Sequence, residues 1–403
     1  MIKSLKLYAR YFSSSLFTGQ ARKFLIHDLK KYGFNKKYFE RPPKPNVEQK
    51  RPALQKAVSW LVKAQESTPD GGMGCYHLVN GWSSSYPETS GYIIPTLIEY
   101  YHMEKDERSL SSAMRTADWL LSIQKQSGGW QGGKIAENKP EVVFNTAQII
   151  RGMLAAHREN NNPKYLDAAI RAGDWLCGIQ HSEGYWKKHA LMDRPRVYDS
   201  YTDAPLLMLW EITKNDPYKK AAIRNLEWII EHKQNENGWL EDCDNTVKRN
   251  DKPILHTIAY TIDGLLHSGK ILKQEKYIMA AKKSADVLLD VFLKKGYLNG
   301  RFDRNWNGTE YMMTTGWAQT AIIWFDLFRI SGEKKYLDAA RKLNDLLTGI
   351  QQRGFNESVN TRGAMPGSVP VWGKYEPFAF PNWATKYFAD ALMKELKLEP
   401  DID

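Results

Sequence analysis

The chain repeats one helical segment at a fixed interval. Residues 165–180, YLDAAIRAGDWLCGIQ, match residues 336–351, YLDAARKLNDLLTGIQ, in ten of sixteen positions. The two copies start 171 residues apart, which is three intervals of 57. Further copies begin near Leu54, lie around Trp119 and Gln124, and begin at Tyr218 and Tyr277. The apolar residues of each copy follow the period of an α-helix, so the sequence predicts six copies of one helical unit.

A second, more apolar helix follows each copy after a glycine-containing loop. These helices begin in PETSGYIIPTL, FNTAQIIRGML, SYTDAPLLMLW, HTIAYTIDGLL, TTGWAQTAIIW and PNWATKYFADAL. A helix that is apolar nearly all round has neighbours on every side, whereas the first helices carry a charged stripe. Six such hairpins can close a ring without an unpaired end. We therefore predict an all-α fold, an (α/α)6 toroid over residues 49–398, preceded by a basic helical extension over residues 1–48.

Positive charge is concentrated in that extension. Residues 1–41 hold ten Lys and Arg against only Asp28 and Glu40, in a chain of net charge +11. Its apolar residues fall roughly on one helical face, which favours contact with an anionic membrane surface. The alternative is a helix packed across the outside of the barrel. Nucleic acid is not expected as a partner, because the basic residues lack an interleaved recognition motif.

The sequence also bears on location. Its three cysteines lack CxxC spacing, and the N-terminus lacks the pattern of a secretory signal. No run approaches eighteen apolar residues. We expect a cytoplasmic protein, peripheral to the inner membrane face if the extension binds lipid.

Aligned on their first turns, the six inner helices carry a polar residue at one equivalent position. The residues are Glu88, Asn145, Tyr201, His256, Thr314 and Asn382. Asn and Thr are ordinary N-caps, so capping is the alternative role for them, but Glu, Tyr and His are not. The ring of helix N-termini also directs partial positive charge into the funnel, which favours a bound carboxylate. We predict catalytic roles for Glu88, Tyr201, His256 and Asn145, and substrate binding by Asn382.

The loops supply a second set of candidates, since they alternate Gly, Trp and Arg in GGWQGG, GYWKK, NGWL, GRFDRNW and RGAMPGSVPVWG. Sugar rings stack on Trp, and Arg pairs with carboxylates through two parallel hydrogen bonds. We predict stacking on Trp130 and Trp372, carboxylate binding by Arg301 and Arg362, and a substrate contact from Tyr311. The alternative is that the loop tryptophans hold the hairpin tops together.

Neither a metal nor a cofactor is expected. Asp242, Cys243, Asp244 and His256 offer ligand atoms, but zinc sites use a second Cys or His at fixed spacing. The sequence contains no glycine-rich phosphate loop and no GxSxG turn.

Three segments, WLLSIQKQSGGW, WLCGIQHSEGYW and WIIEHKQNENGW, resemble the glutamine/tryptophan repeats of triterpene cyclases and prenyltransferase β subunits. HTIAYTIDGLL is similar to the prenyltransferase helix that carries a zinc-binding His. However, EDCDN at residues 241–245 departs from the DxDD motif of the cyclases, and the Asp-x-Cys ligand pair of the prenyltransferases is absent. This resemblance implies the fold, and a prenyltransferase-like or terpene-cyclase-like enzyme as one alternative.

A longer resemblance starts near residue 50, through GWSSSYPETSGYIIPTL, VFNTAQIIRGMLAA, RGAMPGSVPVWG and FPNWATKYFADAL. These segments resemble toroid proteins encoded among bacterial exopolysaccharide and O-antigen biosynthesis genes, which implies an acidic glycan or a lipid-linked oligosaccharide as partner. Toroid uronate lyases and glucuronyl C5-epimerases are more distantly similar. They use Asn, His, Tyr and Arg at the cleft, residue types supplied here by Asn145, His256, Tyr201, Arg301 and Arg362.

Together these features favour an enzyme that removes the C5 proton of a uronic acid. Asn145 and an Arg would neutralise the carboxylate, and His256 or Tyr201 would take the proton. Returning it on the opposite face gives epimerisation, and protonating the leaving oxygen gives β-elimination. One alternative is a glycoside hydrolase that uses Glu88 and Asp203 as paired carboxylates. Another is a glycan-binding or assembly protein without turnover.

Overall fold

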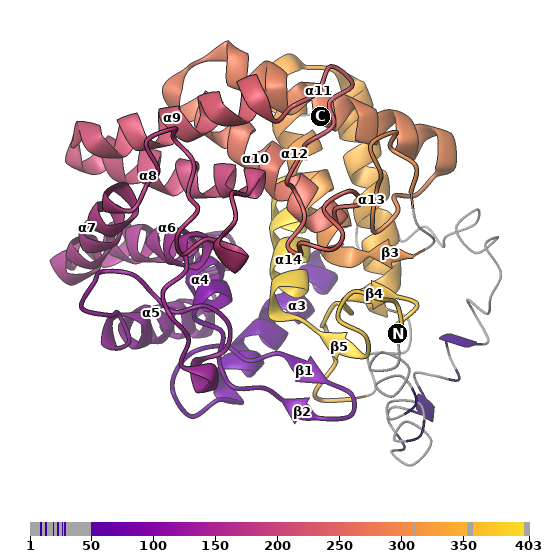
Figure 1. Ribbon diagram of the computed structural model, residues 1–403. Helices are drawn as coiled ribbons and strands as arrows, with labels where there is room; N and C mark the ends of the chain where they lie inside the picture. The colour runs from indigo at the N-terminus through magenta and orange to yellow at the C-terminus, as the bar shows by residue number, and fades with distance from the viewer. Residues whose placement is uncertain are drawn as a thin grey trace.

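The computed structural model describes residues 50–308, 311–352 and 358–398, together with eight single residues before residue 50. Helices make up most of the described part and form two concentric rings (Figure 1). The outer ring consists of α3 (Lys50–Glu66), α5 (Glu107–Ser122), α7 (Pro163–Gly178), α9 (Asp216–His232), α11 (Glu275–Lys295) and α13 (Lys334–Gln352). The inner ring consists of α4 (Pro87–Glu104), α6 (Val143–Asn160), α8 (Ser200–Thr213), α10 (Leu255–Leu272), α12 (Thr314–Ser331) and α14 (Asn382–Leu396). The expected (α/α)6 toroid is confirmed.

The inner ring is closed, because each inner helix packs against the next and α14 packs back against α4. Among the outer helices, each of the first five inner helices packs most extensively against the one that follows it in the chain. In these five pairs only two residues connect the inner helix to the outer helix, as between α4 and α5. The first of the two residues has a left-handed backbone conformation in every pair, which ends the inner helix and reverses the direction of the chain. The pairing thus differs from the expected outer-then-inner order.

The sixth pair is made from the two ends of the toroid, since α3 packs against α14. The Lys50 ammonium, almost fully buried, pairs with the equally buried Glu395 carboxylate and lies 3.0 Å from Asp345. Asn344 donates a 2.8 Å hydrogen bond to the same Glu395 carboxylate. This clasp replaces the short turn that joins the other five pairs.

The sequence repeat is explained by contacts that recur between neighbouring outer helices. A glutamine near the end of one outer helix donates to a backbone carbonyl of the next, from Gln65 to Ser112, Gln124 to Ala168, Gln180 to Ala221, Gln234 to Ala280 and Gln351 to Ala53. The last of these closes the outer ring. Four of the glutamines also bond the carbonyl of a loop glycine with positive φ, at Gly71, Gly128, Gly184 and Gly363. A side chain would be strained at those four positions.

Glycines set how deeply the inner helices sit relative to one another. A Cβ added at Gly264 of α10 would lie 2.4 Å from the backbone of Ser200, so the start of α8 is level with the third turn of α10. The 3-10 helix η5 (Val197–Asp199) precedes α8 and packs on α10 above that point. Tyr201 therefore lies deeper in the barrel than the alignment on first turns implied.

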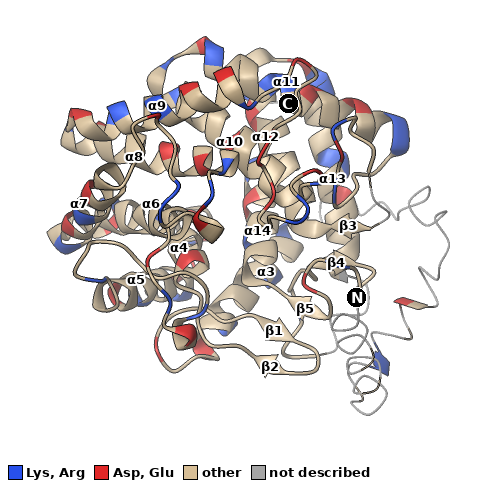
Figure 2. Cartoon of the chain, in the orientation of Figure 1, with Lys and Arg blue, Asp and Glu red and all other residues tan. Residues whose placement is uncertain are grey.

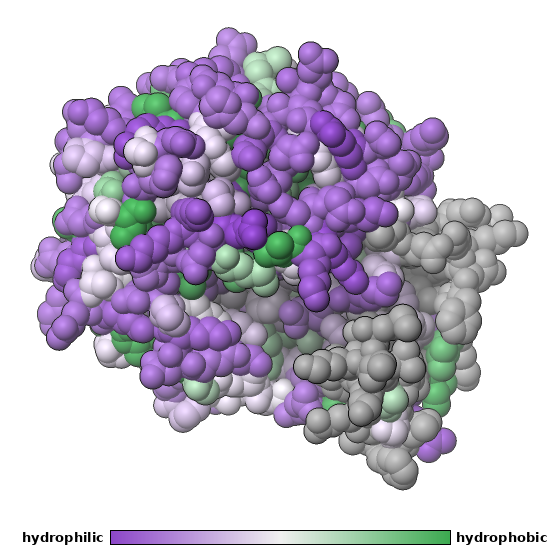
Figure 3. Space-filling view, in the orientation of Figure 1, coloured by the Kyte–Doolittle hydropathy of each residue, from purple (hydrophilic) through white to green (hydrophobic). Residues whose placement is uncertain are grey.

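Long loops lead from each outer helix to the next inner helix and gather on one face, the mouth of the barrel (Figure 1). Short antiparallel strands tie them together. β1 (Tyr76–His77) pairs with β2 (Gly81–Trp82) and with β5 (Ala379–Phe380), which joins the first loop to the last. β3 (Met312–Met313) pairs with β4 (Ser368–Val369). Figure 2 shows charged residues spread over the outer helices, and Figure 3 shows the mouth face hollowed between the loops.

Most of the basic extension, residues 1–41, lies outside the described residues, and so does the predicted membrane contact. One described residue, Asp28, is buried and accepts a 2.8 Å hydrogen bond from the backbone N–H of Val371 in the last mouth loop. No helix in the described part is both long and apolar enough to cross a bilayer.

Candidate functional site

All six polar residues of the predicted ring lie in the first turn of an inner helix. Their surroundings differ, however. Two of them serve the fold: the Thr314 hydroxyl bonds the carbonyl of Pro366, and the Asn382 amide donates to the carbonyls of Met73 and Gly74. Asn145 is buried at the start of α6. Glu88 and His256 are the two whose environment suits proton transfer.

The Glu88 carboxyl is half-buried and has no hydrogen-bond or ion-pair partner in the described ranges. Burial raises its pKa from the ordinary 4.5 to about 7. The charge of Glu88 contributes to raising the pKa of five nearby tyrosines, namely Tyr86, Tyr92, Tyr198, Tyr260 and Tyr375. A carboxyl with a pKa near neutrality changes its charge at physiological pH, which is the property that a catalytic acid needs.

His256 is held in one orientation. Its Nδ1 lies 2.7 Å from the Gln319 side-chain oxygen on α12, which can only accept, so Nδ1 carries the proton. Nε2 then keeps its lone pair. Burial lowers the pKa of His256 to about 4, so the ring is neutral at physiological pH. A neutral imidazole with a fixed tautomer is suited to act as a base through Nε2.

Aromatic rings form the floor between these residues and the inside of the barrel. Tyr260 lies one turn after His256, with ring centres 4.3 Å apart, and contacts Tyr201 and Tyr387 at 4.7 and 6.0 Å. The hydroxyl of Tyr387 lies 3.5 Å from that of Tyr201, and its ring contacts Tyr92. We call Tyr92, Tyr201, Tyr260 and Tyr387 the tyrosine layer. Tyr201 belongs to this layer, below His256.

Four residues of the mouth were missed by the sequence reasoning. The Tyr375 ring lies 5.9 Å from that of His256, and its hydroxyl accepts a 2.8 Å hydrogen bond from the Trp383 indole. The ring of Trp383 meets that of Tyr86 edge-on. Lys134 lies over the Tyr86 ring, 5.6 Å from its centre, and brings a cation to this side of the mouth. Tyr375 and Lys134 come from irregular loops, and their sequence signal was only proximity to the Gly/Trp segments.

Several predicted residues do not join this group. Asp203 is fully buried and bonded to Asn225 of the outer helix α9, so the structure does not bring it together with Glu88. Trp130 has no exposed surface, and its indole N–H donates a hydrogen bond to the Leu120 carbonyl, so it fixes the mouth loop to the end of α5. The expectation of sugar stacking on Trp130 is therefore wrong.

The remaining loop residues have mixed placements. Arg301 donates to the buried Asp244 carboxylate and to the Lys252 carbonyl, both at 2.6 Å, so that guanidinium nitrogen is occupied within the loop. Trp372 is half-buried, Tyr311 is half-buried beneath the Lys374 ammonium, and Arg362 is exposed.

The acidic segment considered as a metal group also serves loop folding. Asp244 accepts from Arg301 and from backbone amides, Asp242 pairs with Lys233, and the Cys243 thiol lies 3.5 Å from the Thr261 hydroxyl. Burial raises the pKa of Cys243 to about 12, so the uncoordinated side chain is a neutral thiol at physiological pH.

Comparison with known proteins shows the fold. No family model matches the chain. Among curated proteins, a terpene cyclase–glycosyl transferase fusion protein of Humicola fuscoatra is 23% identical over 229 residues, which are 53% of this chain and 16% of that protein. The match therefore spans only a small part of that relative.

Solved structures match over most of both chains. An unsaturated glucuronyl hydrolase specific for heparin has a TM-score of 0.68 at 15% identity, covering 88% of this chain and 99% of that one. A sugar epimerase from a ruminal bacterium has a TM-score of 0.70 at 13% identity, covering 89% and 99%. An unsaturated glucuronyl hydrolase from Streptococcus agalactiae has a TM-score of 0.65 at 17% identity, covering 89% and 94%. The chain shares the α/α toroid of these carbohydrate enzymes.

Proposed function

We propose that this protein is a carbohydrate-active enzyme that acts on an acidic, uronate-containing glycan by moving the C5 proton. The observation that carries the proposal is that two inner helices begin at the same mouth with residues suited to proton transfer: His256, a neutral imidazole with a fixed tautomer, and Glu88, a carboxyl whose pKa lies near 7. Their pKa values are shifted in opposite directions. Near pH 6 this gives one group ready to accept a proton and another ready to donate one.

The mouth also suits a sugar acid. The half-buried rings of Tyr86 and Tyr375 offer apolar faces and hydroxyls to a pyranose, and the buried Trp383 packs against Tyr86 and donates to the Tyr375 hydroxyl. Lys134 is our candidate partner for the uronate carboxylate, because one terminal nitrogen of Arg301 is already engaged with Asp244 and the Lys252 carbonyl. The known toroid structures of similar shape act on unsaturated glucuronyl groups or epimerise sugars, as their names state. That supports the substrate class.

In the proposed reaction Lys134 neutralises the carboxylate, which makes the C5 proton more acidic. The Nε2 atom of His256 takes this proton, while Gln319 holds the Nδ1 proton. Protonated Glu88 then donates its proton to C5 from the opposite face, which gives the epimer, or to the leaving glycosidic oxygen, which gives elimination. Each turnover leaves His256 protonated and Glu88 ionised, and exchange with water restores both.

The rate should depend on pH in the form of a bell. His256 is active when neutral, above its pKa of about 4, and Glu88 is active when protonated, below its pKa of about 7. We expect kcat/KM to be highest between these values and to fall tenfold per unit well outside them. A rate that keeps rising above pH 8 would contradict Glu88 as the acid.

The direct test is proton NMR of uronate-containing oligosaccharides, free and lipid-linked, incubated with the protein in D2O. Deuterium at C5 indicates epimerisation, whereas loss of the C5 proton together with a new ultraviolet-absorbing double bond indicates elimination, and either result supports the proposal. His256→Ala and Glu88→Gln should each reduce exchange at least a hundredfold. Lys134→Met should lower kcat as well as raise KM, because Lys134 both binds the carboxylate and makes the C5 proton more acidic. The control Glu236→Gln, on an exposed mouth loop, should leave the rate unchanged.

Two other outcomes would replace the proposal. Release of reducing ends without C5 exchange and without a new ultraviolet-absorbing double bond would favour a glycoside hydrolase, with Glu88 and a carboxylate other than Asp203. Binding without turnover would favour a glycan-binding protein.

A further inference from the structure

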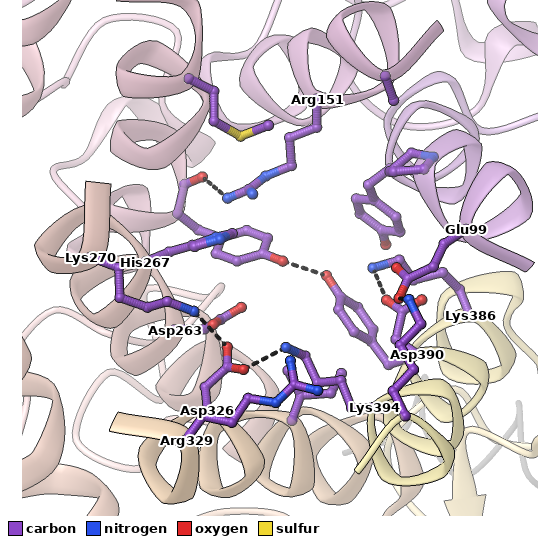
Figure 4. Close-up of a pocket in the computed structure, with 18 of the residues that line it drawn as sticks. Glu99, Arg151, Asp263, His267, Lys270, Asp326, Arg329, Lys386, Asp390 and Lys394 are labelled. Carbon is purple, nitrogen blue, oxygen red and sulfur yellow. Dashed lines mark hydrogen bonds and ion pairs between the residues drawn. The ribbon is translucent and has the colours of Figure 1, made fainter. Parts of the chain in front are cut away.

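A second cavity opens at the end of the barrel opposite the mouth. It has a volume of about 350 Å³ and is lined by the later turns of the inner helices (Figure 4). Tyr92, Tyr201 and Tyr387 of the tyrosine layer form its floor, so the layer separates it from His256. Small-molecule sites in proteins start at about 300 Å³, so the cavity is large enough for one monosaccharide.

The charges around this cavity do not balance. Seven Lys or Arg residues line it against four Asp or Glu residues, an excess of three positive charges. Four lysines have acidic partners: Lys386 with Asp390 at 2.6 Å, Lys394 and Lys270 with Asp326, and Lys397 with Glu99. The three arginines, Arg151, Arg158 and Arg329, have no acidic partner within hydrogen-bond distance in the described part of the chain. Because the four lysines share three acids and only Asp263 remains for the arginines, the larger part of the excess lies on guanidinium groups.

Helix dipoles explain some of these cations. Arg158, Lys270, Arg329 and Lys394 lie in the last turns of their helices, where positive charge offsets the partial negative charge of free carbonyls. Arg151 is different, because it lies in the middle of α6, two turns before the helix ends. It is buried, and a buried cation requires compensation.

Arg151 is also held in a fixed position. Its Nε donates to the Gln148 side chain at 3.0 Å, one terminal nitrogen donates to the Tyr201 carbonyl at 3.1 Å, and the guanidinium lies 4.2 Å from the centre of the Tyr201 ring. The second terminal nitrogen has no partner in the residues that the structure describes. Figure 4 shows the side chain reaching into the cavity. A fixed guanidinium with a free N–H edge suits a phosphate or carboxylate oxygen.

Hydrogen-bond acceptors lie across the cavity. The Asp263 carboxyl lines it without a hydrogen-bond partner in the described residues. Burial raises the pKa of Asp263, and the neighbouring Asp326 adds to this effect. Burial, together with the charges of Arg151 and Lys270, lowers the pKa of His267 to about 3, which leaves a neutral imidazole. Carboxyl, imidazole and tyrosine groups are suited to the hydroxyls of a sugar.

From this arrangement we infer that the far-end cavity is a second binding site, for a small polyhydroxylated anion such as a monosaccharide that carries a phosphate or carboxylate. The anionic group contacts Arg151 and the rim arginines, Arg158 and Arg329, and the hydroxyls contact Asp263 and His267. The site is separate from the proposed proton-transfer site.

The test is isothermal titration calorimetry of the full chain with inorganic phosphate and glucose 6-phosphate, and with glucose as the neutral probe. We expect glucose 6-phosphate to bind more tightly than phosphate, and glucose not to bind at millimolar concentration. Arg151→Met should weaken glucose 6-phosphate binding 10- to 100-fold, since a hydrogen bond to a charged group contributes about 1.5–3 kcal/mol. The rim variant Arg158→Gln/Arg329→Gln should weaken it several-fold and reduce its salt dependence.

The rim variant changes only exposed side chains, so it keeps the test valid if Arg151→Met does not fold. Glu88→Gln, at the mouth, should leave the affinity unchanged. Three results would overturn the inference: no saturable binding of either anion at millimolar concentration, binding that survives both arginine variants, or binding that is lost in Glu88→Gln.

Discussion

Replacing Glu88 by Gln should make the protein more stable, and increasingly so as the pH rises. The pKa of Glu88 is about 7 in the folded state, against an ordinary value of 4.5. Between these two values the folded state therefore holds a proton that the unfolded state releases. Stability falls across this window as the pH rises, because the unfolded state binds fewer protons. Above pH 7 the folded protein carries a poorly solvated carboxylate.

The size of the effect follows from the shift. A pKa difference of one unit corresponds to 1.36 kcal/mol, so a shift of this size corresponds to about 3 kcal/mol at pH 8. Gln has nearly the same shape and no charge at any pH. The difference in unfolding free energy between Glu88→Gln and wild type should thus be small at pH 4.5, grow up to pH 7, and then stay constant. His256 titrates in both proteins, so its contribution largely cancels in the difference.

The assay is urea unfolding of both proteins, followed by circular dichroism, in half-unit steps from pH 4.5 to 8.5. Glu236→Gln, on an exposed loop of the same face, is the control and should show no pH-dependent difference. A difference for Glu88→Gln that is constant over the whole range would refute the reasoning, because it would mean that the Glu88 carboxyl is as well solvated in the folded protein as in the unfolded chain.

Three further substitutions test the architecture. Lys50→Met should destabilise the fold by about 3 kcal/mol in chemical denaturation, because it leaves the buried Glu395 without its cation; an unchanged midpoint would show that the clasp does not close the ring. Gly264→Ala should cost about 1–3 kcal/mol, since its Cβ would overlap the Ser200 backbone, and equal stability would mean that α8 is free to shift. Trp130→Phe should lower the melting temperature and leave glycan affinity unchanged, whereas the opposite pattern would restore Trp130 as a sugar platform.

The comparison of sequence with structure is clearest at the inner-helix starts. The alignment of first turns placed Glu88 and His256 correctly at the mouth, because both helices begin at the level of the loops. It placed Tyr201 too high, since the depth of α8 is set by the contact between Gly264 and Ser200 on two different helices. Asp203 was misplaced for a related reason: one helical turn contains residues that face inward and residues that face outward, and Asp203 faces α9.

The sequence by itself determined the two rings, because the spacing of apolar residues and the repeated Gln, Tyr and Gly positions depend on local geometry that every repeat must satisfy. It also determined which residues begin the inner helices. Only the tertiary structure decided which of those residues share the mouth, that Tyr375 and Lys134 join them from irregular loops, and that Arg151 faces a second cavity. These relations join residues distant in the chain, and they depend on helix depth and loop path, which no local pattern encodes.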